Sequence, residues 1–382
     1  MKEDWKECKL GEVCYFAKDK VSVSELNNDI YISTENMMPN RGGITKATNL
    51  PTGEQTPSFE SGDILVSNIR LYFKKIWKAT FSGGCSADVL NFKARNNISN
   101  DFLYYVLSDD EFFKYCMTTS KRTKMPRGDK VAIMQYPINL PPLATQQKIA
   151  TILSSLDDKI ELNNKINQNL EQQAQAIFKS WFVDKYEKNG IIGDYCTIKS
   201  GFAFKSSWWQ NEGTKVIRIG DIEQGYLSLE TCAHVSNDKI EIAKDFIVQG
   251  GDLVIAMTGA TIGKFSMIPK TQDPILVNQR VGKFFLGDNP IEKVPFIYCT
   301  LKQDEILTEF INRGQGSAQP NISTGDVLSI PCWIPEQQEI DNFNQTVQPM
   351  FDVIVSNQQE NQKFVSLRDT LLPKLMKREI EV

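Results

Sequence analysis

Residues 145–183 read TQQKIATILSSLDDKIELNNKINQNLEQQAQAIFKSWFV and contain neither glycine nor proline. Apolar residues recur in this stretch mostly three or four positions apart, a spacing that places them on one face of an α-helix. The members of this apolar seam are Ile149, Ile152, Leu156, Ile160, Ile166, Leu170, Ala174, Ile177 and Trp181. Because an apolar face is unfavourable in water, the stretch predicts a long helix that packs against a second element.

A second stretch of similar length, residues 336–372, repeats this pattern near the end of the sequence. Its apolar positions are Ile340, Phe343, Val347, Phe351, Ile354, Phe364, Val365 and Leu372. Pro349 interrupts the stretch and predicts either a kink or a helix that begins only there. We expect the two helices to bury their seams on each other as an antiparallel coiled coil, with polar residues near Asn163 and Asn357 fixing the register. The alternative is two independent surface helices, each covering its own domain.

Four short sequence markers occur twice in the same order along the chain. Their copies begin at residues 11 and 193, 59 and 248, 102 and 296, and 142 and 335, at offsets between 182 and 194 residues. A repeat of about 190 residues is much longer than a solenoid repeat, so each copy must contain a domain. The chain is therefore a duplication, and a two-fold relation between its halves would make the two helices antiparallel.

Each copy begins with a part that mixes short apolar runs with Gly, Asn, Asp and Ser. The runs at 63–67 and 252–256 each follow a Gly-Asp turn and predict buried strands. Residues 102–118 and 296–312 predict helices that pack on those strands. The predicted fold class is α+β: two similar α/β domains, separated by two long helices in an antiparallel coiled coil.

The predicted boundaries follow from this division. We expect globular domains over residues 1–142 and 189–335, and spacer helices over residues 143–188 and 336–382.

The composition limits the classes of function. The chain has 382 residues with a formal net charge of −4, and no apolar run is long enough to span a membrane, so we expect a cytoplasmic protein. Its eight cysteines are dispersed without a CxxC pair, and His234 is its single histidine, so no metal site is expected. The net charge argues weakly against nucleic-acid binding, but DNA responds to local patches of charge.

Several strings resemble the specificity subunits of type I restriction-modification systems. They are LPPLATQQKI at 140–149, AIFKSWFVD at 176–184, GSAQPNIS at 316–323, and the helix start IPEQQ at 334–338. The order domain, helix, domain, helix is also that of this family. The first half departs from the pattern, because it has SKRTKMPR at 120–127 where the second half has the GSAQPNIS string.

The resemblance implies a DNA-binding protein without a catalytic site of its own. Its two target recognition domains would each bind one half of a split, asymmetric site in double-stranded DNA. The helices would serve as a ruler and as the docking surface for two modification (methyltransferase) subunits, through which restriction subunits join. No cofactor is expected on this chain, since S-adenosylmethionine would be bound by the modification subunits.

The first half contains the clearest basic cluster, residues 120–130, which can neutralise DNA phosphates. Its candidate DNA-binding residues are Lys121, Arg122, Lys124 and Arg127. Asn68 and Arg70, just after the predicted strand at 63–67, carry side chains suited to base edges. The alternative for the cluster is a solvated loop with incidental charge.

The corresponding loop of the second half is rich in amides and hydroxyls, which can hydrogen-bond base edges. The candidates of this half are Ser317, Gln319 and Asn321 in the loop, Asn278, Gln279 and Arg280 before it, and Lys205 near its start. The alternative for these residues is ordinary turn chemistry beside core aromatic rings.

Two segments resemble enzyme motifs but lack residues that those motifs require. GATIGKF at 259–265 is one residue short of a phosphate-binding loop and ends in Phe instead of Ser or Thr. NLPPL at 139–143 lacks the contiguous Asn-Pro-Pro-aromatic order of an amino-methyltransferase. A self-contained DNA methyltransferase and a coiled-coil scaffold without DNA affinity remain as alternatives to the specificity subunit.

Overall fold

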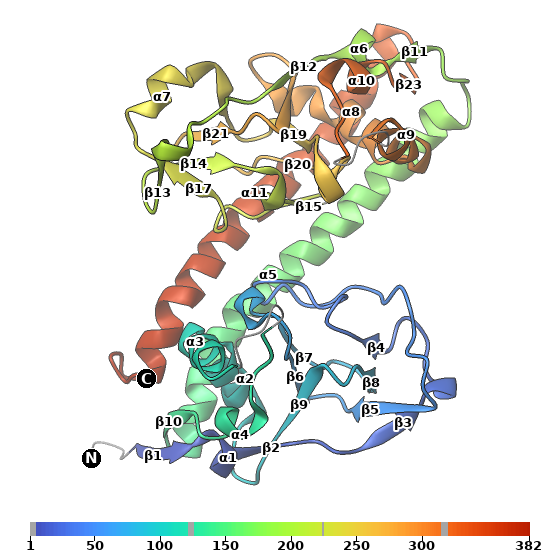
Figure 1. Ribbon diagram of the computed structural model, residues 1–382. Helices are drawn as coiled ribbons and strands as arrows, with labels where there is room; N and C mark the ends of the chain where they lie inside the picture. The colour runs from blue at the N-terminus through green and yellow to red at the C-terminus, as the bar shows by residue number, and fades with distance from the viewer. Residues whose placement is uncertain (1–4, 121–125, 224, 315–319) are drawn as a thin grey trace. The chain divides into compact units, whose positions relative to one another are not determined.

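The computed structural model describes residues 5–120, 126–223, 225–314 and 320–382 (Figure 1). The chain divides into two compact units. Unit 1 comprises Met1–Asp158 with Phe364–Val382, and unit 2 comprises Lys159–Lys363. Each unit contains one β-rich globule and a segment of both long helices.

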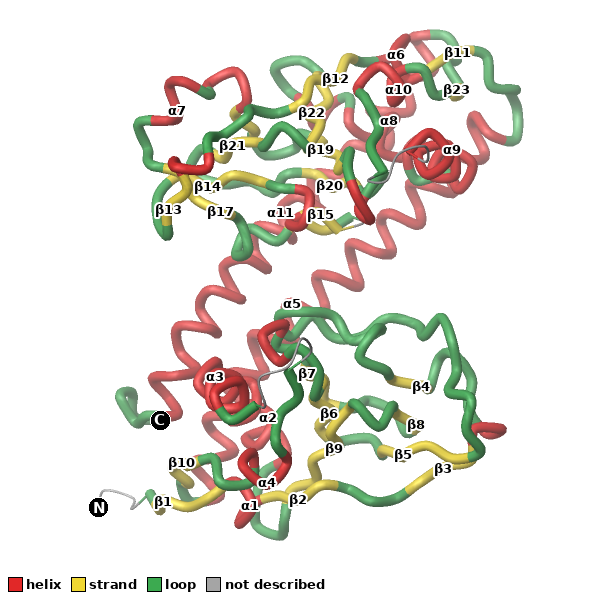
Figure 2. The backbone as a smooth tube through the Cα atoms, viewed as in Figure 1, coloured by secondary structure: helices red, strands yellow, loops and turns green. Residues whose placement is uncertain are grey.

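The globule of unit 1 is built on two four-stranded sheets (Figure 2). The first, fully antiparallel, has the order β2 (Cys14–Phe16), β9 (Val89–Ala94), β6 (Ile64–Ser67) and β7 (Ile76–Lys78). The second has the order β3 (Lys20–Ser22), β5 (Gln55–Phe59), β8 (Gly83–Cys85) and β4 (Tyr31–Ile32), with β4 and β8 parallel. A short pair, β1 (Lys6–Lys9) with β10 (Pro137–Leu140), joins the two ends of the globule's sequence.

The globule of unit 2 repeats this plan. Its antiparallel sheet has the order β12 (Thr197–Ser200), β22 (Val281–Phe285), β19 (Leu253–Ala256) and β20 (Phe265–Met267). Its second sheet has the order β13 (Trp209–Gln210), β17 (Ala233–Val235), β14 (Thr214–Ile217), β21 (Ile275–Val277) and β18 (Ile247–Val248), and again contains one parallel pair, β14 with β21. The short pairs are β11 (Gly190–Ile191) with β23 (Pro331–Cys332), and β15 (Ile222–Glu223) with β16 (Tyr226–Leu227).

Each globule also carries helices, most of which pack into the hydrophobic core that its antiparallel sheet shares. In unit 1 they are α1 (Leu10–Val13), α2 (Asn100–Ser108), α3 (Asp110–Thr118) and α4 (Lys130–Ile133). In unit 2 they are α6 (Ile192–Tyr195), α7 (Lys239–Ile242), α8 (Val294–Leu301), α9 (Asp304–Gly314) and α10 (Thr324–Leu328).

The helices predicted at 102–118 and 296–312 are each divided in two. In unit 1 the break is at Asp109, whose backbone is extended and ends α2. The Asp109 side chain then caps α3, because it accepts a hydrogen bond from Glu111 N at 3.0 Å. An aspartate inside an apolar helical pattern can therefore mark a new helix start.

The two long helices are α5 (Leu143–Phe178) and α11 (Gln337–Met376). A single π-helical turn, η3 (Lys179–Val183), follows α5. Helix α11 begins at Gln337, so the alternative in which the helix begins only at Pro349 is wrong. Pro349 is exposed, where water can satisfy the carbonyl group that loses its helical partner.

The helices pack antiparallel, as predicted. In unit 2 Asn163 Nδ2 donates to Asn361 Oδ1 at 3.0 Å, and Asn357 Nδ2 donates to Asn167 Oδ1 at 2.8 Å. The residue number therefore rises along one helix while it falls along the other. The predicted α+β class, with two β-rich domains and a pair of long antiparallel helices, is confirmed.

The seam itself differs in detail from the predicted one. Ile152 and Ile166 are 38% and 37% exposed, whereas Leu153 is fully buried. The buried face runs instead from Ile149 through Leu153, Asn163 and Asn167 to Ala174, all at most 8% exposed. Two asparagines thus occupy seam positions where the sequence pattern suggested isoleucines, and their amides hydrogen-bond Asn361 and Asn357 on the facing helix.

A buried tyrosine–carboxylate–cation cluster joins globule to long helices within each unit. In unit 1 Asp157 Oδ2 accepts from Tyr105 Oη at 2.7 Å, and Asp157 Oδ1 accepts from Arg368 Nη1 at 2.8 Å. In unit 2 Glu171 accepts from Tyr298 Oη at 3.0 Å and pairs with Lys302 Nζ at 3.0 Å. Burial raises the pKa of both tyrosines, and the nearby carboxylate raises it further.

Among the described residues, no helix has both the length and the apolar character needed to cross a lipid bilayer.

Candidate nucleic-acid interface

In both units a central strand of the antiparallel sheet ends in a tight turn that has positive φ at both ends. Strand β6 leads into residues 70–74 and strand β19 into residues 259–263, with one 3-10 turn in each, η2 (Leu71–Phe73) and η7 (Gly259–Thr261). Both ends of each turn have positive φ: 51° at Arg70 and 49° at Lys74, against 75° at Gly259 and 81° at Gly263. We call these segments the unit 1 turn and the unit 2 turn.

The loop predicted to bind DNA is attached to this turn in the same way in both units. In unit 1 Ile69 forms a β-bridge with Arg127, and Arg70 N donates to Pro126 O at 3.2 Å. In unit 2 Thr258 forms the bridge with Asn321, and Gly259 N donates to Pro320 O at 2.8 Å. Residues that are far apart in sequence therefore share one surface in each unit.

A third segment, just before strands β9 and β22, completes each surface. Asn68 N donates to Asp88 O at 2.8 Å in unit 1, and Met257 N donates to Arg280 O at 3.0 Å in unit 2. The structure thus brings together Asn68, Arg70 and Arg127 in one unit. It brings together Arg280 and Asn321 in the other.

Comparison with known proteins bears directly on this repeated surface. The family model of the type I restriction modification DNA specificity domain matches residues 2–172 and again residues 186–364. The chain belongs to this family. The resemblance seen in the sequence is confirmed, and the two matched segments account for the duplication.

Similar proteins cover almost the whole chain. The HindI specificity subunit of Haemophilus influenzae is 24% identical over 99% of this chain and 100% of its own length. The MjaVIII specificity subunit of Methanocaldococcus jannaschii is 25% identical over 100% of this chain and 94% of its own. The crystal structure of a type I S subunit from M. genitalium shares the fold, with a TM-score of 0.54 and 16% identity over 98% of this chain and 96% of that one.

The protein is therefore a specificity subunit, the non-catalytic member of a type I restriction-modification system. This assignment replaces the alternatives of a self-contained methyltransferase and of a scaffold. Within the part of the chain that the structure describes, no group of three or more His, Cys, Asp and Glu residues is arranged to hold a metal ion.

The surface of unit 1 in this specificity subunit is built from charged pairs. Arg127 Nη2 lies 3.0 Å from Asp88 Oδ1 and remains largely exposed. Asn68 is buried, with 7% exposed, and its Oδ1 accepts no hydrogen bond from any described residue. A buried acceptor without a partner is costly, and here it belongs to the residue two positions before the turn.

The surface of unit 2 is built from neutral hydrogen bonds. Thr258 Oγ1 donates to Asn321 Oδ1 at 2.8 Å. Asn278 is buried, whereas Gln279 and Arg280 are exposed. Gln279 N donates to Phe202 O at 2.9 Å, which attaches the loop that follows β12 to this surface.

Lys205 lies further along that loop. It is exposed, and its Nζ lies 5.5 Å from the centre of the Trp208 ring. The remaining predicted residues, Lys121, Arg122, Lys124, Ser317 and Gln319, lie outside the described residues.

Sequence reasoning missed the side chains that hold and extend the unit 1 turn. Asp110 accepts hydrogen bonds from Arg41 and from Lys74, the latter at 2.8 Å. Burial alone would raise the pKa of Asp110, but these hydrogen bonds outweigh it and hold the pKa below its ordinary value. Tyr72, at the tip, is 50% exposed. Aligning the two turns at their offset would have shown that Tyr72 stands where the second copy has Thr261.

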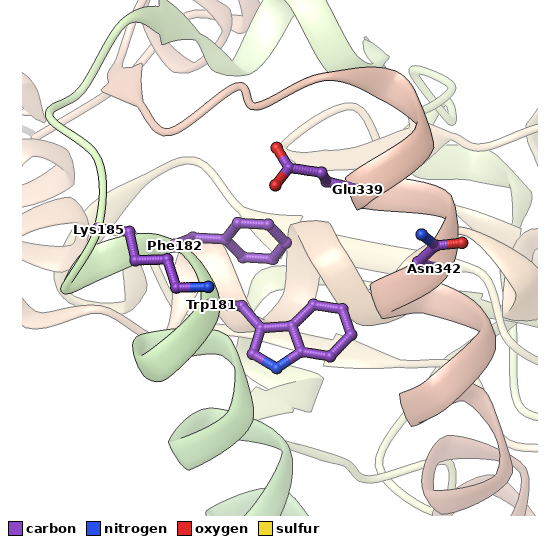
Figure 3. A pocket seen from close by; sticks show the side chains of 5 residues that line it. All are labelled: Trp181, Phe182, Lys185, Glu339 and Asn342. Atoms are coloured by element: carbon purple, nitrogen blue, oxygen red, sulfur yellow. The ribbon is translucent and has the colours of Figure 1, made fainter.

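A separate hollow of about 230 Å³ in unit 2 lies at the end of α5 (Figure 3). It is lined by Trp181, Phe182, Lys185, Glu339 and Asn342. The rings of Trp181 and Phe182 pack on Phe343 at centroid distances of 5.9 and 5.3 Å. We therefore assign this hollow to packing between η3 and the start of α11.

Proposed function

We propose that this specificity subunit binds a bipartite, asymmetric site in double-stranded DNA, with one half-site read by each unit. The recognition domains would comprise residues 1–142 and 189–335, and residues 143–188 and 336–382 would be the spacers between them. The observation that carries the proposal is the surface of three segments that recurs in both units with different side chains on it.

The chemistry of the two surfaces fits two different half-sites. Unit 1 presents Arg70 and Arg127, which suit phosphate contacts and the O6 and N7 acceptors of guanine. Unit 2 presents Gln279, Arg280 and Asn321, and amide side chains suit the adenine edge. Because backbone hydrogen bonds attach each surface to the end of a central strand, its donors and acceptors are preorganised for base contacts.

The partners follow from the family. We propose that the subunit assembles in the cytoplasm with two modification subunits, which hold S-adenosylmethionine and methylate adenine, and through them with restriction subunits. A related solved structure is described as showing complex assembly of the type I restriction-modification system. For this chain, the exposed faces of α5 and α11 are the proposed docking surface, since Leu162 and Val353 are 51% and 42% exposed on them.

The test is to express the chain with its cognate modification subunits in a host and to map methylated adenines by single-molecule sequencing. We expect one bipartite motif, with unread base pairs between two different half-sites, that disappears when this chain is omitted. A motif that persists without the chain, or one without a gap, would contradict the proposal.

A matched control replaces residues 189–335 with the corresponding segment of another specificity subunit. This exchange should change one half-site and leave the other unchanged. A change in both half-sites would mean that the units do not read DNA independently.

A further inference from the structure

The unit 1 turn retains side chains at two positions where the unit 2 turn has glycine. Positive φ is unfavourable for residues that carry a Cβ atom, and only glycine adopts it freely. Arg70 and Lys74 nevertheless hold φ values of 51° and 49°, where Gly259 and Gly263 hold 75° and 81°. Unit 1 thus carries a conformational cost that unit 2 avoids in the same turn.

Neighbouring segments hold the unit 1 turn rigidly in place. Asn40 N donates to Phe73 O at 2.8 Å, and Arg41 N donates to Lys74 O at 3.0 Å. Asn40 and Arg41 themselves have φ values of 53° and 63°. The Arg41 side chain also donates through Nε to Ser108 O at 2.8 Å, which fixes the turn to the end of α2. Strained residues persist only where their surroundings hold them, and such places are often functional.

The tip of this rigid turn is an exposed aromatic ring among basic residues. Tyr72 is 50% exposed, and its ring lies 4.5 Å from that of Phe73 at an angle of 49°. Lys75 Nζ lies 5.8 Å from the Phe73 ring. Aromatic rings interleaved with cations are typical of nucleic-acid surfaces. The equivalent residue of unit 2, Thr261, is partly buried and bonds its own turn through Thr258 O.

We propose that Tyr72 is a specificity-determining residue for the half-site bound by unit 1, and that its ring makes an apolar contact with base edges. The thymine C5-methyl group is the part of a base edge that fits such a contact. The inference rests on the proposed function, and it assigns to unit 1 an aromatic contact that unit 2 lacks. Arg70 N bonded to Pro126 O places the turn beside the loop already proposed to contact DNA.

The experiment compares Tyr72→Ala and Tyr72→Phe with the wild type, each co-expressed with the modification subunits. Tyr72→Ala should relax one base position in one half-site, with about a tenfold loss of discrimination there in competition binding between duplexes. Tyr72→Phe, which keeps the ring, should retain the wild-type motif. The second half-site should be unchanged in both variants.

Tyr15→Ala is the matched control. Tyr15 is 43% exposed and lies in β2 of the same unit. It pairs with Lys93, and the adjacent Phe92 pairs with Ile64, where β6 begins. Because the unit 1 turn follows the other end of β6, Tyr15 lies at the opposite end of the sheet. The complex with Tyr15→Ala should methylate the same DNA motif as the wild-type complex. Melting curves of all variants show whether each is folded.

Two results would overturn the inference. One is an unchanged motif in folded Tyr72→Ala. The other is an equal loss of affinity for every DNA sequence, which would assign Tyr72 to the phosphate backbone. A wild-type complex that methylates no bipartite motif would instead contradict the proposed function, so the two failures are distinguishable.

Discussion

The unit 1 and unit 2 turns have positive φ at two equivalent positions but place different kinds of residue there. Unit 2 places Gly259 and Gly263 at the two positions of positive φ, and unit 1 places Arg70 and Lys74 there at a cost of about 1–2 kcal/mol each. In unit 1 the ion pairs of Asp110 offset part of this cost. The difference teaches that a duplicated domain can keep its scaffold while the tips of its turns present different chemistry.

The largest expected effect concerns the clusters that join globule and long helices. Arg368→Ala should lower the free energy of unfolding by about 3–5 kcal/mol, because it removes a side chain that is only 9% exposed and takes the cation from the partly buried Asp157 carboxylate. The equivalent change in unit 2, Lys302→Ala, should cost only about 1 kcal/mol, since the Lys302 side chain is 24% exposed against 9% for Arg368, and Arg368 also pairs with Asp369. Urea unfolding followed by circular dichroism measures both. An equal loss of unfolding free energy in the two variants would show that the two clusters do not differ in their contribution to stability.

The next effect separates backbone strain from crowding in the unit 2 turn. Gly263→Ala should cost about 2 kcal/mol, because its φ is 81° and a Cβ atom would lie 3.2 Å from Phe310 Cβ. Gly259→Ala, with a φ of 75° and open space around it, should cost about 1 kcal/mol from strain alone. Both values come from thermal or urea unfolding. If neither variant loses stability, the strain attributed to the unit 1 turn is also wrong.

A smaller effect tests the contrast between the ion pair of Arg127 in unit 1 and the neutral bond between Thr258 and Asn321 in unit 2. Arg127→Ala should make the dependence of log K on log salt shallower by about 1, as expected for one lost phosphate contact. Asn321→Ala should leave that slope unchanged, because an amide releases no counterion. Asp88→Asn controls for the ion pair of Arg127. If Asp88→Asn makes the salt dependence shallower by the same amount, the effect comes from the ion pair between Arg127 and Asp88 and not from a phosphate contact.

The smallest effect is a dependence on pH confined to the unit 1 turn. The folded-state pKa of Asp110 lies below its ordinary value, so its ion pairs add stability above about pH 4, and this contribution is lost as the pH falls further. Asp110 is half-exposed, which limits the effect to less than about 1 kcal/mol. The stability difference between wild type and Asp110→Asn should therefore shrink from pH 5 to pH 3. A constant difference would rule out this titration.

Much of the architecture could be predicted from local patterns. The Gly-Asp turns before 63–67 and 252–256 correctly located β6 and β19, since buried strands and their turns depend on neighbouring residues. The apolar periodicity located both long helices, but it chose Ile152 and Ile166 for a seam that Leu153, Asn163 and Asn167 occupy. A spacing of three and four is compatible with more than one face, and only the partner helix decides between them.

The candidate site could be predicted only in part. Asn68, Arg70 and Arg127 were chosen for their chemistry, and the fold places them together through backbone hydrogen bonds from residue 68 to 88 and from residue 70 to 126. Tyr72 and Asp110 were missed, because neither belongs to a motif. What singles them out is a strained turn and the helix end that braces it.

The sequence alone was sufficient to predict the duplication, the two long helices and the family. Repeats, periodicity and short motifs can all be recognised from the order of residues without the fold. Three further features needed the folded molecule: which helix face is buried, which three segments form each surface, and which turn carries strain. Each depends on contacts between residues dozens of positions apart, and those contacts exist only after the sheets have formed.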